Sequence, residues 1–175
     1  MNTFAACLLF LSSWMVTAPL EISADRPPLS LELIVPITDP SGEREISMAR
    51  YPRIHAKLTN ESRQPVRVWK DWNTWGYFNL KLFWIADGEQ HPIERVSLKH
   101  WDGDFPDFWT LPPGESVILE VDLRTAKWTG FPDLYGESIE ATLHGTYQNI
   151  ADPLASEFDV WTGTLHADPI RVVFR

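Results

Sequence analysis

Residues 53–60 read Arg-Ile-His-Ala-Lys-Leu-Thr-Asn, and this octapeptide decides the fold. Its apolar side chains Ile54, Ala56 and Leu58 alternate with polar ones, and a period of two is the signature of a half-buried β-strand. The polar positions Arg53, His55 and Lys57 form a basic stripe. Because runs of charge on one face are usually solvated, we interpret the stripe as the outer face of a sheet.

The same period recurs along most of the chain, at residues 29–37, 78–84, 117–123, 139–147 and 170–174. Asp87-Gly88 lies between two apolar runs, which predicts a tight hairpin. The 14 prolines are spread throughout, and we find no long capped amphipathic helix between them. Short strands separated by turns predict an all-β fold, a single antiparallel β-sandwich of about 7–9 strands.

Three segments carry a family resemblance: Ile54–Asn60, the Pro65-Val66-Arg67-Val68 run, and residues 111–117, which read Leu-Pro-Pro-Gly-Glu-Ser-Val. Together they resemble bacterial immunoglobulin-like domains, in which a strand ending in Leu-x-Asn precedes a Pro-Val strand and a Pro-Gly-Glu turn opens a later one. The resemblance spans roughly residues 29–174 and implies an immunoglobulin-like sandwich over residues 25–175. Such domains serve as adhesion modules, inhibitors, chaperone parts and spacers, so the fold does not fix the function.

The first 24 residues are typical of a secretory signal peptide. Phe4 to Val16 is an uncharged apolar run, too short to span a membrane, and Ile22-Ser23-Ala24 is an acceptable cleavage site. We therefore expect a secreted or periplasmic protein that is not inserted in the membrane after cleavage. The only cysteine, Cys7, lies in this segment, so the mature chain would have no disulfide.

The net charge argues against one class of partner. The chain carries −9, and removal of Glu21 with the signal peptide leaves −8. Nucleic acids are bound through basic surfaces, so we expect no nucleic-acid partner.

Aromatic residues are concentrated in one part of the chain, because six of the nine tryptophans fall between Trp69 and Trp109. The strongest candidate site is a loop at one end of the predicted sandwich, where binding residues commonly lie. Its candidate ligand-binding residues are Asp71, Trp72, Asn73, Trp75 and Tyr77, with Trp101 as a further member. These rings either fill the open end of the sandwich, or anchor a protein partner, or stack on a polysaccharide.

A weaker candidate follows the aromatic loop. Asp102, Asp104 and Asp107 offer carboxylate oxygens to calcium, with Gly103 at the turn between them. Aspartate and glycine are also ordinary turn residues. The five histidines show no zinc-binding spacing, and no nucleophile or phosphate-binding motif occurs.

Two smaller features have structural readings. Asn60 is interpreted as a cap of its strand end, although Asn60-Glu61-Ser62 also matches a glycosylation sequon. The connection over residues 124–137 is expected to pack as a lid that protects an edge strand.

The sequence thus predicts an exported, non-enzymatic binding or assembly module with a protein partner and no cofactor. The first alternative is a carbohydrate-binding module that uses exposed tryptophans. The second is a calcium-dependent or hydrolytic domain around residues 102–107.

Overall fold

The computed structural model describes residues 27–36, 40–49, 52–97, 105–125 and 127–175. The predicted signal peptide, residues 1–24, lies outside these ranges. Nearly all the regular elements are strands, in the order β1 (Leu29–Ile34), β2 (Glu45–Ile46), β3 (Arg53–Asn60), β4 (Val66–Trp69), β5 (Leu80–Ala86), β6 (Glu89–Arg95), β7 (Phe108–Leu111), β8 (Ser116–Asp122), β9 (Trp128–Thr129), β10 (Ile139–Asn149), α1 (Pro153–Glu157), β11 (Gly163–His166) and β12 (Ile170–Phe174).

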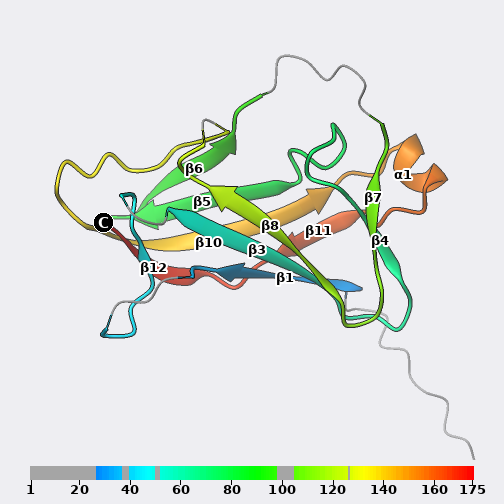
Figure 1. The fold of residues 1–175 in the computed structure, drawn as a ribbon, viewed down its shortest axis with the longest axis horizontal. Coiled ribbons are helices and arrows are strands. Elements are labelled where there is room, and N and C mark those ends of the chain that lie inside the picture. Colours follow the sequence, from blue (N-terminus) through cyan, green and yellow to red (C-terminus); the bar gives the residue numbers. More distant parts are fainter. Residues whose placement is uncertain (1–26, 37–39, 50–51, 98–104, 126) are drawn as a thin grey trace, which may run out of the picture.

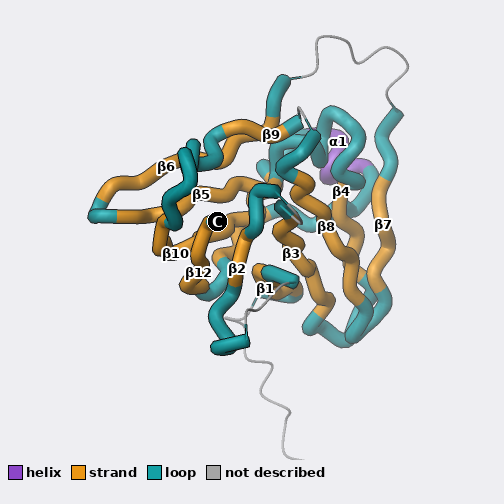
Figure 2. The backbone as a smooth tube through the Cα atoms, turned by 60° about the vertical axis from the view of Figure 1, so that its left-hand side comes forward, coloured by secondary structure: helices purple, strands orange, loops and turns teal. Residues whose placement is uncertain are grey.

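The strands form two main sheets. The smaller has the order β1-β3-β8, and the larger has the order β2-β12-β10-β5-β6-β9 with β11 also paired to β10. In Figure 2, β5, β6, β10 and β12 lie together on the left of the molecule, and β3, β8 and β7 lie on the right. Among the named strands of the described residues, every pairing is antiparallel except that of β2 with β12. The all-β, sandwich-like prediction is therefore confirmed, whereas the immunoglobulin-like type stays a prediction.

Strand β3 has the burial that its alternation predicts, since Ile54, Ala56 and Leu58 are fully buried. It lies between β1 and β8, antiparallel to both. The basic stripe faces outward and is half-exposed, and carboxylates on the neighbouring strands pair with two of its members. It is the outer face of a sheet, as predicted, and it also carries cross-strand ion pairs.

The two sheets share one core. Leu33 of β1 lies directly against the backbone of Gly145 in β10, where an added Cβ would come within 2.8 Å of the leucine side chain. A side chain at this position would force Leu33 to shift, so glycine allows the opposite sheet to approach the strand closely. Within the larger sheet, Trp84 of β5 packs on Phe174 of β12 with ring centroids 5.6 Å apart.

The Asp87-Gly88 hairpin is confirmed and joins β5 to β6. Both residues have positive φ, 52° and 82°, as a type I′ turn requires. Beyond β6, the two-residue strand β9 pairs with its outer edge, and Trp84 Nε1 donates to the carbonyl of Gly130 at 2.9 Å. The 124–137 connection therefore protects an edge strand through its β9 segment, as predicted.

A further pair of strands, β4 and β7, forms its own antiparallel ladder at one end of the molecule (Figure 1). The β3–β4 and β7–β8 connections turn at the same place, where Asn60 holds both. Its buried Nδ2 donates to the carbonyls of Gln64 and Leu111, each at 2.8 Å, and its Oδ1 accepts from the backbone N–H of Ser62 at 2.9 Å. Asn60 thus caps the strand end, as expected.

Helix α1 lies at the same end of the molecule (Figure 1). Asp152 caps it by accepting from the backbone N–H of Ala155 at 2.8 Å, and a proline occupies its first turn. Among the residues described, no helix has the length and hydropathy needed to cross a membrane.

Candidate functional site

The aromatic segment forms an irregular loop between β4 and β5, as predicted, and Asn73 organises it. The side chain of Asn73 is 1% exposed. Its Oδ1 accepts from the N–H of Gly76 at 2.9 Å, and its Nδ2 donates to the carbonyl of Asp107 at 2.7 Å. A Cβ on Gly76 would lie 2.2 Å from the carbonyl oxygen of Lys70, so the turn closes only with glycine. The loop is therefore fixed to the start of β7.

A buried cation anchors the other side of the loop. Arg95, at the end of β6, donates through Nη2 to the Asp71 carboxylate at 2.9 Å and through Nη1 to the carbonyls of Asp71 and Tyr77 at 2.7 and 2.8 Å. Its guanidinium also lies over the ring of Tyr77, 4.2 Å from the centroid. The Tyr77 hydroxyl donates to the carbonyl of Val96 at 3.0 Å. Asp71 and Tyr77 are thus engaged within the fold.

Two of the tryptophans help to fill the end of the sandwich. Trp69 is 1% exposed and packs against Trp75, Phe108 and Phe158, at centroid distances of 5.8, 6.3 and 6.1 Å. Together with Ala155 of α1, these rings form a small second core. Of the alternatives given by the sequence, filling of the open end of the sandwich therefore applies to Trp69 and to the half-buried Trp75.

Trp72 differs from its neighbours, because 58% of it is exposed. Its ring meets the half-buried Trp109 edge to face, with centroids 5.5 Å apart and planes at 82°. Lys70 Nζ lies 4.8 Å from the Trp72 centroid and donates to Oδ2 of Asp107 at 2.6 Å. We call Lys70, Trp72, Asp107 and Trp109 the Trp72 face. It presents one large ring, held between a second ring and an ion pair.

The predicted ligand-binding set is therefore divided by the structure. Asn73 and Tyr77 are buried, and both side chains bond to the backbone of the fold, so their role as ligand-binding residues stays a prediction. Asp71 is half-buried and paired with Arg95. Trp72 lies on the surface, and Trp101 falls outside the described residues.

The calcium prediction concerns three carboxylates, of which Asp102 and Asp104 lie outside the described residues. Asp107 has both oxygens engaged, because Oδ2 accepts from Lys70 and Oδ1 accepts from the backbone N–H of Phe108 at 2.9 Å. Within the described ranges, no three His, Cys, Asp or Glu side chains come together as metal ligands do.

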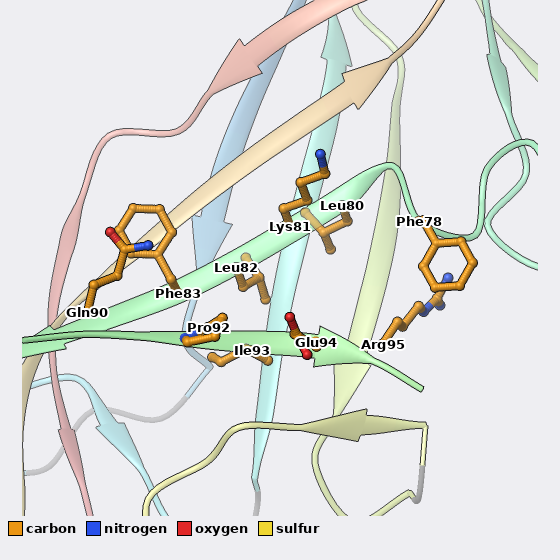
Figure 3. A pocket seen from close by; sticks show the side chains of 10 residues that line it. All are labelled: Phe78, Leu80, Lys81, Leu82, Phe83, Gln90, Pro92, Ile93, Glu94 and Arg95. Carbon is orange, nitrogen blue, oxygen red and sulfur yellow. The ribbon is translucent and has the colours of Figure 1, made fainter. Parts of the chain in front are cut away.

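A groove that sequence reasoning did not single out lies over the β5–β6 hairpin. It has a volume of about 500 Å³, and the side chains that line it from outside the core include Phe78, Lys81, Phe83, Gln90, Pro92 and Glu94. Figure 3 shows Phe78 and Arg95 at one end of the groove and Gln90 and Phe83 at the other. Phe83 stacks on His144 of β10, with centroids 4.6 Å apart and planes at 6°. The sequence feature that points to this groove is Phe83, an apolar residue on the outward face of strand β5.

One ionisable group near the loop has a shifted pKa. Burial raises the pKa of Tyr147, in β10, to about 12, and a hydrogen bond donated by Asn79 at 3.4 Å opposes the shift. The phenol is therefore neutral at physiological pH and serves as a packing group.

Comparison with models of protein families gives no match to this chain, and comparison with curated proteins gives none either.

Proposed function

We propose that this chain is an exported, non-enzymatic binding module of the immunoglobulin-like type, and that the Trp72 face is where it contacts a protein partner. The observation that carries the proposal is the placement of Trp72, which is mostly exposed and yet fixed by its neighbours. Tryptophan is among the residues most enriched at the energetic centres of protein interfaces.

The fixed geometry favours binding for an entropic reason. A side chain that is free in solution loses rotamer entropy when a partner immobilises it, which costs about 0.5–1.5 kcal/mol. Trp109 packs against one edge of Trp72, and Lys70 lies over its ring. The loop below is tied down through Asn73 and Arg95. The exposed indole is therefore largely preorganised.

A protein partner fits this face better than a polysaccharide does. Sugar recognition combines stacking on a ring with hydrogen bonds between the sugar hydroxyls and free carboxylates or amides. The nearby candidates Asp71 and Asn73 are both engaged within the fold. The Lys70–Asp107 ion pair at the border of the face instead suits the polar rim of a protein interface.

The test is site-specific photocrosslinking in the producing cell. A photoreactive phenylalanine analogue replaces Trp72 in one variant and Tyr135 in the matched control. Tyr135 is 94% exposed in the connection that follows β9, well separated from the Trp72 face along the chain. We expect a discrete crosslinked protein from position 72 and none of the same mass from position 135.

The captured protein is then purified and titrated against the unmodified chain, Trp72→Ala and Tyr135→Ala. Loss of affinity confined to Trp72→Ala supports the proposal. Equal crosslinking at both positions, or equal affinity of all three proteins, contradicts it. Tryptophan fluorescence that a polysaccharide changes in the unmodified chain and not in Trp72→Ala would favour the carbohydrate alternative.

A further inference from the structure

Strand β8 forms one edge of the smaller sheet (Figure 1). The backbone N–H of Leu123 donates to Pro52, and the N–H of Asn60 donates to Glu115, so the odd-numbered residues of β8 direct their backbone groups toward β3. Those of Ser116, Ile118 and Glu120 point the other way. Within the described part of the chain, no strand pairs with this side of β8.

The part of β8 whose outward backbone groups have no strand partner has defined ends. Beyond Glu120, the carbonyl of Asp122 accepts from the hydroxyl of Thr125 at 2.7 Å. Before Ser116, the N–H of Gly114 donates to the carbonyl of Asn60 at 2.8 Å. The available backbone groups therefore belong to Ser116, Ile118 and Glu120, and Ile118 is their centre.

The outer strands of the larger sheet and the second edge strand of the smaller sheet are protected. The larger sheet ends on both sides in two-residue strands, β2 and β9, and very short edge strands are a common defence against pairing with another chain. Strand β1 contacts β11 of the opposite sheet. Strand β8 is seven residues long, contains neither lysine nor proline, and carries Ile118 at 57% exposure on its outer face.

The face that surrounds Ile118 is electrically balanced. Its charged side chains form ion pairs. Arg53 lies 3.3 Å from Glu120 and 3.5 Å from Asp122. Arg124 lies 3.0 Å from Asp122, and Lys57 lies 3.8 Å from Glu32. Three cations thus match three anions, although the chain as a whole carries −9. A second copy can approach here without the like-charge repulsion that an acidic surface would impose.

We propose that two copies of this chain associate through their β8 strands, which pair antiparallel about a two-fold axis through Ile118. In this register Ile118 exchanges both backbone hydrogen bonds with the partner's Ile118, and Ser116 does so with the partner's Glu120. No like charges face each other. The two smaller sheets then become one continuous sheet through both copies. This inference does not rest on the Trp72 face.

A symmetric axis allows a sharp test, because any residue at position 118 faces its own copy. Sedimentation velocity of the purified protein is expected to show a dimer. Ile118→Lys and Ile118→Glu each place like charges opposite each other, and we expect each to raise the dimer dissociation constant about a hundredfold or more. An equimolar mixture of the two variants is expected to restore the dimer.

Ile118→Val is the matched control, since it keeps a β-branched side chain and should stay dimeric. Thermal unfolding of every variant at a concentration where all are monomeric verifies that each is folded. Ile118→Pro gives an independent test, because it removes only the outward N–H and leaves the β3 ladder intact. It too should be monomeric.

Three results would overturn the proposal. The first is an unmodified chain that stays monomeric at all accessible concentrations. The second is a dimer that persists in Ile118→Lys and Ile118→Pro. The third is tighter association of Ile118→Lys, which would pair position 118 with the partner's Glu120 and move the axis to Leu119.

Discussion

Arg95 and Asp71 form a bidentate link between the last residue of β6 and the aromatic loop. Arg95 donates to both the carboxylate and the backbone carbonyl of Asp71, at 2.9 and 2.7 Å. The guanidinium also lies over Tyr77 and Trp128, 4.2 and 5.0 Å from their ring centroids. One cation therefore joins the loop, the β6 strand and the β9 segment.

Removal of the carboxylate from this link should destabilise the protein strongly. Asp71→Ala leaves the Arg95 charge, whose side chain is only 10% exposed, without its counter-ion. Breaking one side of a buried pair costs about 3–5 kcal/mol, and we expect the lower end because Asp71 keeps some solvent contact. Urea unfolding measures the change. Glu140→Gln, which breaks the exposed pair with Arg171, is the control and should cost less than about 1 kcal/mol.

Two tryptophans of one segment should respond very differently to truncation. Trp69→Ala removes a fully buried ring from the second core, and we expect a loss of about 3–5 kcal/mol in the free energy of unfolding. Trp72→Ala removes a mostly exposed ring and should cost about 1 kcal/mol or less. Denaturant unfolding followed by circular dichroism compares them. Similar costs would mean that Trp72 is a core residue, contrary to its place here.

Asn60 is expected to be one of the polar positions at which substitution destabilises the fold most. Asn60→Ala would remove the amide donor to the carbonyl of Leu111 in a buried corner, and one of two side-chain donors to the carbonyl of Gln64. An unsatisfied buried group costs about 1–3 kcal/mol, so we expect a loss in this range. Ser62→Ala, at the exposed side of the same turn, is the comparison and should cost less. Equal costs in urea unfolding would show that the corner does not depend on the amide.

Lowering the pH should remove the contribution that Asp122 makes to the free energy of unfolding. Hydrogen bonds from Arg124 lower the pKa of this carboxyl from 3.8 to about 2, with a smaller contribution from the Arg53 charge. A lowered folded-state pKa stabilises the fold above pH 4, and the benefit disappears as the pH falls through 2. Relative to Asp122→Asn, the unmodified chain should be more stable by less than about 1 kcal/mol at pH 7, because the pair is partly solvated. Thermal unfolding of both proteins from pH 7 to 2, at low protein concentration, checks whether the gap closes.

Much of the fold follows from local pattern. The alternation in residues 53–60 predicts β3 with its buried side chains, and Asp87-Gly88 predicts the β5–β6 hairpin and its backbone angles. Periodicity does not reveal partners, however. Nothing in the sequence shows that β2 runs parallel to β12, or that β4 and β7 leave the main sheets to pair with each other. Both pairings depend on contacts between distant segments.

The candidate site illustrates the same limit. Trp72 and Tyr77 are aromatic residues five positions apart in one loop, yet Trp72 is exposed and Tyr77 is 3% exposed. This difference in exposure arises because Arg95, 18 residues further along the chain, contacts the carbonyl and the ring of Tyr77. Helix α1 was in principle detectable, since Asp152-Pro153 is a typical helix start. At five residues it is too short for any periodicity to reveal.

The corner at Asn60 also bears on the order in which the molecule assembles. Its amide joins segments that are 51 residues apart, so the turn after β3 is complete only when the turn before β8 has arrived. Chains dominated by such distant contacts fold slowly, on the order of milliseconds to seconds. A nascent chain must therefore wait for the segment around Leu111 before Asn60 can close the corner.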